Sequence, residues 1–238
     1  MHLRAGQFFA TTILGAMLSA AAQPSQQPDE SAIIRDLDAA NQARFDNVLS
    51  FTDIEHYAVF RGSDQAHPAA EMTVKMTYKK GIGKDYVILS KSGSSLIQRV
   101  GLQPLLDNEK VINNPAKVAQ SWFNSANYEM HLKPNVTQSI DDHACVALAI
   151  TPRHKAPNMI DGTIWVDAQT HALVEVEGIA SKDPSIFAGT TTMMRRYATM
   201  QGYTMATHAR AESSSMFFGK TVVAIDYSDY QFELRPAQ

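Results

Sequence analysis

"DGTIWVDAQTHALVEVEG", Asp161 to Gly178, is the stretch that decides the fold class. Apolar and polar residues alternate up to Asp167, the letters AQTH interrupt the pattern, and the alternation then resumes. A period of two is typical of a strand with one buried face and one solvated face. Two such strands around a short polar break predict an antiparallel hairpin.

The same alternation recurs on both sides of this hairpin. Before it, EMTVKMTYKK (71–80) places apolar side chains on one face and polar side chains on the other. After it, strand-length runs continue to Phe232, with turns predicted at Gln201-Gly202 and Phe218-Gly219. We expect about ten strands joined by short turns.

Helical spacing is found in two regions. Asp29 can cap a helix over residues 30–48, in which apolar residues recur at intervals of three and four. A second region, 94–127, has the same spacing with prolines as breaks and predicts two or three short helices. The fold class is therefore mainly β within an α+β chain: one strongly curved antiparallel sheet covered by an N-terminal helix and a short helical insertion.

The N-terminus has the pattern of a cleaved secretory signal peptide. Arg4 precedes an apolar run over 8–18, and small residues lead up to Ala22. The apolar run has only half of the roughly 20 residues that a membrane-spanning helix needs. We expect residues 1–22 to be the signal peptide and residues 23–238 to form a single domain.

Charge and cysteine content restrict the setting and the partners. The formal net charge of the 238 residues is −3, a weakly acidic balance that argues against a nucleic-acid partner. Cys145 is the only cysteine, so no internal disulfide is expected. Because eukaryotic secreted domains of this kind usually carry several cysteines, the bacterial periplasm or cell exterior fits better.

The strong catalytic signatures are absent from the sequence, and neither a catalytic residue nor a cofactor is expected. His143 and Cys145 stand two apart on a predicted strand, as metal ligands could, but a small buried cysteine beside a surface histidine explains them equally simply. No metal site is expected. Asp226 and Asp229 could pair as acid and base. They also fit the solvated half of an alternating strand.

Arg195 and Arg196 are adjacent on a predicted strand, so their side chains point to opposite faces of the sheet. One guanidinium must therefore face the covered side, where a buried arginine needs partners. It could act as a polar latch that donates to carbonyls of a covering loop while the cavity is empty. The alternative is a salt bridge at the rim of the sheet.

The order of elements resembles the bacterial LolA/LolB-like outer-membrane lipoprotein-sorting superfamily. GTIWVDAQTHALVEVEG (162–178) is similar to its strand-turn-strand, with Asp167 opening the turn. QGYTMATHARAES (201–213) and KTVVAIDYSDYQF (220–232) are similar to its closing strands. The resemblance implies an unclosed half-barrel with a helical lid over an apolar cavity that takes acyl chains or other lipid tails.

These observations together predict a secreted or periplasmic carrier or sensor of an apolar ligand, namely an acyl chain, a lipid or a lipoprotein. A membrane-bound delivery or acceptor protein is a further expected partner. The alternative is a secreted, non-enzymatic scaffold or interaction module with a filled core. The residues expected to line the binding cavity are Met72, Val74, Met76, Tyr78, Trp165, Val174, Val176, Met205, Val223 and Ile225.

Overall fold

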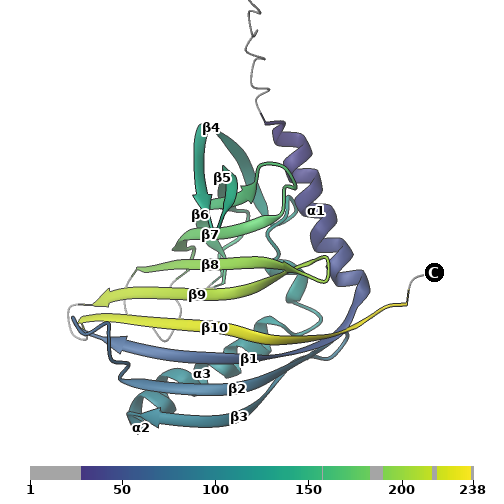
Figure 1. The fold of residues 1–238 in the computed structure, drawn as a ribbon. Helices are drawn as coiled ribbons and strands as arrows, with labels where there is room; N and C mark the ends of the chain where they lie inside the picture. Colours follow the sequence, from purple (N-terminus) through teal and green to yellow (C-terminus); the bar gives the residue numbers. More distant parts are fainter. Residues whose placement is uncertain (1–27, 157, 183–189, 216–218, 237–238) are drawn as a thin grey trace, which may run out of the picture.

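The computed structural model describes residues 28–156, 158–182, 190–215 and 219–236. The expected signal peptide lies outside these ranges. Within them, ten antiparallel strands form one sheet in the order β3-β2-β1-β10-β9-β8-β7-β6-β5-β4 (Figure 1). Because β3 and β4 are both edge strands, the sheet does not close on itself. The expected class, a curved antiparallel half-barrel with helical coverings, is confirmed.

Most strands that follow one another in the chain also pair in the sheet. The exception is the step from β3 to β4, which the helical insertion separates; β10 pairs with β9 and also with β1, and so joins the two ends of the chain. The strands are β1 Val48–Arg61, β2 Ala70–Lys79, β3 Gly83–Gly93, β4 Tyr128–Ile140, β5 His143–Pro152, β6 Ile160–Asp167, β7 Leu173–Ala180, β8 Thr191–Met200, β9 Tyr203–Ser215 and β10 Gly219–Leu234.

The long helix α1, Glu30–Asn47, begins where its sequence predicts. Oδ1 of Asp29 accepts from the backbone N–H of Ser31 at 3.0 Å and of Ala32 at 3.3 Å, which caps two free donors of the first turn. The insertion contains α2 Ser95–Ile97, a π-helical turn η1 Gln98–Leu102, α3 Gln103–Ile112 and a 3-10 turn η2 Val118–Ser121. None of the helices in the described ranges combines the length and apolar character needed to cross a bilayer.

The β6–β7 hairpin forms where the alternation predicts it. Oδ1 of Asp167 accepts from the backbone N–H of Gln169 at 3.0 Å and of Thr170 at 2.8 Å, which shapes the turn. A β-bulge interrupts the pairing, because Trp165 pairs with Glu175 whereas Val166 already pairs with Leu173.

The bulge has a consequence for two expected lining residues. Val174 is the extra residue of the bulge and packs with Trp165 in one cluster, whereas Val176 packs with Ile164 in another. Simple alternation would place Val174 and Val176 on one face, and that part of the expectation is wrong. One inserted residue places the strand residues that precede it on the opposite face from the one that alternation predicts.

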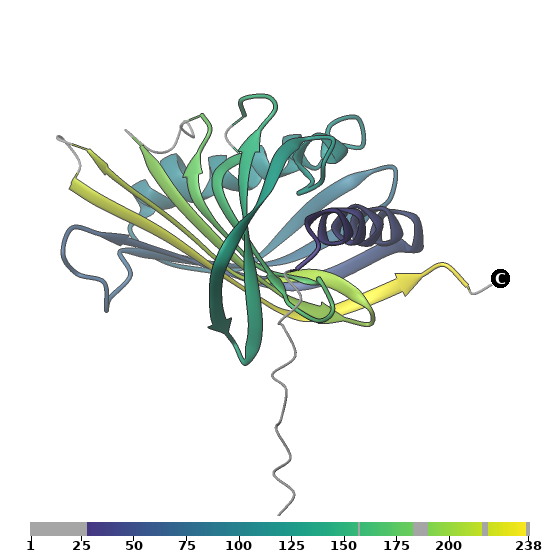
Figure 2. The same ribbon diagram turned by 90° about the horizontal axis from the view of Figure 1, so that it is seen from above.

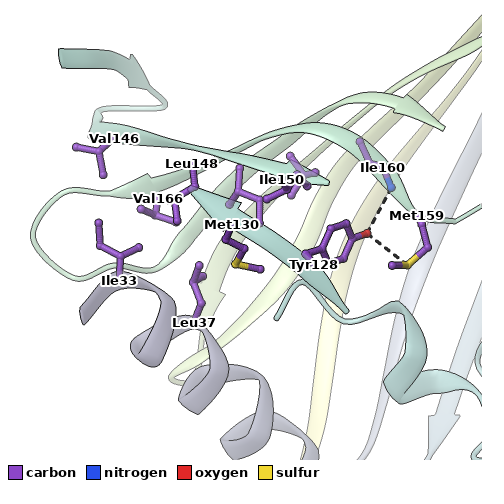
Figure 3. Packing of buried hydrophobic residues seen from close by; sticks show 12 residues of the cluster. Ile33, Leu37, Tyr128, Met130, Val146, Leu148, Ile150, Met159, Ile160 and Val166 are labelled. Atoms are coloured by element: carbon purple, nitrogen blue, oxygen red, sulfur yellow. Dashed lines mark hydrogen bonds between the residues drawn. The ribbon is translucent and has the colours of Figure 1, made fainter. Parts of the chain in front are cut away.

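Two apolar clusters anchor the helices to the sheet. Ile33 and Leu37 of α1 pack over β4–β7, against Leu148, Ile150 and Val166 (Figure 3). The hydroxyl of Tyr128 in the same cluster accepts from the backbone N–H of Ile160 at 3.3 Å (Figure 3). The insertion packs its Leu102 and Leu106 over β1 and β2, against Tyr57, Met72 and Val74. Both coverings thus lie on the same side of the curved sheet, within its concavity (Figure 2).

Candidate functional site

A cavity of about 320 Å³ lies between the concave face of the sheet and the two helical coverings. Its walls come from α1, α3, the segment around Trp122, and the inner faces of β1, β2 and β8–β10. The volume is at the lower end of the range of small-molecule sites. The cavity exists because α1 and α3 cover different halves of the sheet. The part of the concave face between the two helices stays uncovered.

Much of the lining is apolar and adaptable. Three methionines, Met76, Met193 and Met205, face the cavity. Their unbranched thioether side chains can repack around guests of different shape. Aromatic rings complete the wall: Phe45 contacts Trp122 with centroids 5.1 Å apart, and Phe51 contacts Tyr78 at 5.2 Å.

The ten expected lining residues fall into three groups. Those that line the cavity are Met76, Tyr78, Met205, Val223 and Ile225. Those on the concave face but packed beneath a helix are Met72 and Val74, under the insertion, and Val176, under α1. Those on the opposite face are Trp165 and Val174. The indole Nε1 of Trp165 donates to Glu177 at 2.9 Å there.

The two adjacent arginines separate as strand geometry requires. Arg195 lines the cavity. Arg196 points to the other face, where Nε donates to the buried Glu175 at 2.7 Å and Nη1 to Asp141 at 3.3 Å. The salt-bridge alternative therefore describes Arg196. The latch role of Arg195 stays a prediction.

A cluster of charges forms one end of the cavity. Nζ of Lys84 donates to Glu109 of α3 at 3.2 Å and lies 4.0 Å from Glu55 of β1. The hydroxyl of Tyr57 donates to the other carboxylate oxygen of Glu55. Among the described residues, Oδ1 of Asp53 and Oε1 of Glu55 are buried and accept no hydrogen bond.

Burial determines how these acids titrate. Desolvation, reinforced by the nearby Glu55, raises the pKa of Asp53 to about 7. Desolvation also raises the pKa of Glu55, against the opposing effect of Lys84. Desolvation opposes ionisation of Glu109, but Lys84 and Arg195 together with hydrogen bonds from Lys84 and Asn113 lower its pKa. Near neutral pH, Glu109 and Lys84 thus form an ion pair, while Asp53 is close to the midpoint of its titration.

This charged lining is not among the features predicted from the sequence, although the sequence contains patterns that indicate it. Asp53 and Glu55 stand two apart and alternate in phase with Phe51 and Tyr57, which places two carboxyls on a dry strand face. Arg44 follows Leu37 by seven positions, which places a guanidinium on the apolar side of α1. Charged residues that recur in phase with the apolar face of a strand or helix are therefore the sequence pattern that indicates a charged cavity lining.

The other candidate groups do not assemble into a reactive site. Nδ1 of His143 lies 2.9 Å from Asp167, whereas Cys145 is buried in a separate cluster where desolvation raises the thiol pKa to about 11. Asp226 pairs with His208 at 2.6 Å. In the part of the chain that the structure describes, no three His, Cys, Asp or Glu side chains gather to hold a metal ion.

Comparisons with known proteins return structures only. No family model and no curated protein matches the chain. The chain is similar to a DUF1329 family protein from Desulfovibrio piger, at 14% identity and TM-score 0.44 over 87% of this chain and 94% of that one. It is similar to a LolA superfamily protein from Nitrosomonas europaea, at 15% identity and TM-score 0.45 over 87% and 94%. A third structure, described as an outer membrane lipoprotein-sorting protein domain from Vibrio parahaemolyticus, is similar at 13% identity and TM-score 0.46 over 85% and 91%.

Proposed function

We propose that this protein is a periplasmic or secreted carrier or sensor that shelters the apolar tail of a lipid or other hydrophobic ligand between its concave sheet and its helices. The observation that carries the proposal is the cavity of about 320 Å³ with its three methionines and its aromatic wall. A filled scaffold needs no such space, because protein interiors otherwise pack at the density of organic crystals.

The energetics of an apolar guest favour this proposal. Each methylene group removed from water contributes about 0.8 kcal/mol, so a tail of a dozen carbons provides enough to offset the entropy lost on association. No covalent chemistry is required. In this proposal the expected lining residues Met76, Tyr78, Met205, Val223 and Ile225 contact the tail, while Met72, Val74 and Val176 support the wall from beneath the helices.

The proposal also includes the setting and the exchange of the ligand. An N-terminal signal peptide would bring the chain to the periplasm, where a lipid would have to cross water between membranes. A membrane-bound donor or acceptor protein would then load or unload the cavity. The polar latch remains part of the proposal for Arg195, which would donate to covering carbonyls when no ligand is present.

A test of the proposal uses a neutral dye and a variant that fills the cavity. Ala209 lies on the concave face of β9, and its cross-strand partners Arg195 and Ile225 also line the cavity. We expect the wild-type protein to bind the uncharged fluorescent dye N-phenyl-1-naphthylamine. We expect Ala209→Trp to reduce this affinity at least tenfold, because the indole would occupy the space that the dye needs.

The matched control places the same bulk on the opposite face. Ala224 of β10 precedes Ile225 and alternates away from the cavity, so Ala224→Trp should keep the affinity of the wild-type protein for the dye. Thermal unfolding of both variants checks that they are folded. A wild-type protein that binds no dye, or an equal loss in both variants, would favour the scaffold with a filled core.

A further inference from the structure

Two arginines that line the cavity have no carboxylate partner among the described residues. Nη1 of Arg44, on α1, donates to the backbone carbonyl oxygen of Thr204 at 3.1 Å. Arg195 extends from the concave face of β8. Across the residues that the structure describes, no carboxylate oxygen lies within 4.0 Å of either guanidinium. The adjacent Arg196, on the other face, has two acidic partners.

The phenol of Tyr197 lines the same cavity but does not neutralise the two arginines. Tyr197 lines the cavity together with both arginines, and both Arg44 and Arg195 act to lower the pKa of its phenol. Burial outweighs them and raises the pKa above its ordinary value of 10.0. Tyr197 therefore keeps its proton at neutral pH and supplies a hydroxyl group, without a counter-charge.

The other charges of the cavity have partners of their own or are held neutral, and among the described residues none of them contacts Arg44 or Arg195. Glu109 is occupied by Lys84 at 3.2 Å, and it is stabilised by Arg195 only from beyond contact distance. Arg210 pairs with Glu212 at 3.5 Å. Burial raises the pKa of Asp53 to about 7, so that it holds a proton over much of the range below neutral pH, and burial also raises the pKa of Glu55. The remaining phenols that line the cavity, Tyr78, Tyr227 and Tyr230, also have raised pKa values and are neutral.

An unpaired guanidinium inside a covered cavity is costly unless an anion joins it. We propose that the ligand is an acidic amphiphile, whose carboxylate or phosphate head group binds Arg44 and Arg195 while its apolar tail lies among the methionines. Arginine suits both head groups, because its planar fork donates two parallel hydrogen bonds to either oxyanion. This inference rests on the proposed function and adds the chemical class of the ligand.

Competition against the neutral dye separates the head group from the tail. Dodecanoate, dodecanol and dodecyltrimethylammonium share a chain length and differ in head-group charge. We expect dodecanoate to displace the dye at a concentration at least tenfold lower than dodecanol does, since a hydrogen bond to a charged group is worth that factor or more. We expect dodecyltrimethylammonium to be weaker than dodecanol. Acetate, a head group without a tail, should not displace the dye.

Variants of the arginines assign the preference to this site. We expect Arg44→Gln and Arg195→Gln each to reduce the preference for dodecanoate over dodecanol about tenfold, with little change for dodecanol itself. Retained binding of dodecanol shows that each variant is folded. Arg196→Gln is the control: it breaks the contact with Glu175 on the other face and should leave the preference unchanged.

Each outcome supports or overturns one statement. Equal displacement by dodecanoate and dodecanol would overturn the acidic head group and leave the apolar carrier intact. A preference that persists in the protein with both Arg44→Gln and Arg195→Gln would overturn the assignment to these arginines. Absence of binding by the dye and by all three amphiphiles would overturn the proposed function itself. Because the three head groups are compared first on the wild-type protein, a variant that fails to fold does not prevent the test.

Discussion

At the scale of single residues, the cavity combines an apolar wall with charges that a strand or helix would normally expose. Asp53 is 2% exposed and Glu55 is 1% exposed, although their sequence context is ordinary. The cost of burying them is reduced by protonation and by Lys84, which approaches from the start of β3. These residues make the interior sensitive to pH.

Asp53→Asn tests this sensitivity. The folded protein holds a proton on Asp53 up to about pH 7, whereas the unfolded chain releases it near 3.8. The stability that this proton contributes is therefore complete below about pH 4 and is lost as the pH rises through 7. We expect the free energy of unfolding of the wild-type protein to fall by on the order of 2 kcal/mol between pH 5 and pH 8, and to fall less in Asp53→Asn. Urea unfolding at both pH values measures the difference.

Two features complete that experiment. Glu55 has a raised pKa as well, so Asp53→Asn should reduce the pH dependence without abolishing it. Asp142→Asn is the control, because Asp142 lies exposed in the turn between β4 and β5 and should not alter the slope. An identical pH dependence in the wild-type protein and in Asp53→Asn would show that Asp53 is ionised throughout this range.

Residue roles could be predicted only where facing follows from simple periodicity. Met76, Tyr78 and Val223 are placed at the cavity by alternation alone. Alternation fails for Val174, because a β-bulge shifts the alternation of β7 by one residue. The sequence contains no residue pattern that indicates this bulge. The position of Arg44 at the cavity could have been predicted only from a helical projection that includes charged residues as well as apolar ones.

At the scale of elements, the close approach of β6 and β7 depends on two glycines that face each other, Gly162 and Gly178. A Cβ atom on Gly178 would meet the carbonyl oxygen of Asp161 and would lie 2.7 Å from the Cα of Gly162. Both are backbone atoms that cannot rotate away. The hairpin that decides the fold class therefore allows no side chain at this point.

We expect Gly178→Ala to lower the free energy of unfolding by about 2–3 kcal/mol, because the two strands must separate to admit the methyl group. Denaturant unfolding monitored by circular dichroism measures the change. Gly101→Ala is the matched control: its Cβ would lie 3.7 Å from Ile97, at ordinary contact, within the helical insertion. That substitution should be neutral or slightly stabilising. Equal effects of the two substitutions would contradict the close packing of β6 on β7.

The elements themselves were predictable to a large extent. The hairpin, the first helix and the helical character of the insertion follow from period and capping, and the structure has them near the expected positions. The ends of the strands were harder to predict from the sequence. β1 begins at Val48, directly after α1, several residues before its alternation becomes clear, because pairing with β2 and β10 extends it.

At the scale of the whole molecule, curvature and covering together produce the cavity. Ten strands cannot remain flat, and the helices that fill their concavity are too few to fill it completely. The class of fold could be predicted from the sequence for this reason. The volume of the cavity could not be predicted from the sequence, because it depends on the positions of α1 and α3 relative to each other.

The most direct test of the central claim uses methionine methyl groups as reporters inside one molecule. Met76, Met193 and Met205 line the cavity, whereas Met72, Met130 and Met159 are packed in the clusters beneath the helices. With methyl-labelled methionine, NMR spectra recorded during a titration with dodecanoate should show shifts of the signals of Met76, Met193 and Met205 and little change in those of Met72, Met130 and Met159. Signals that do not shift, or that all shift alike, would contradict binding in this cavity.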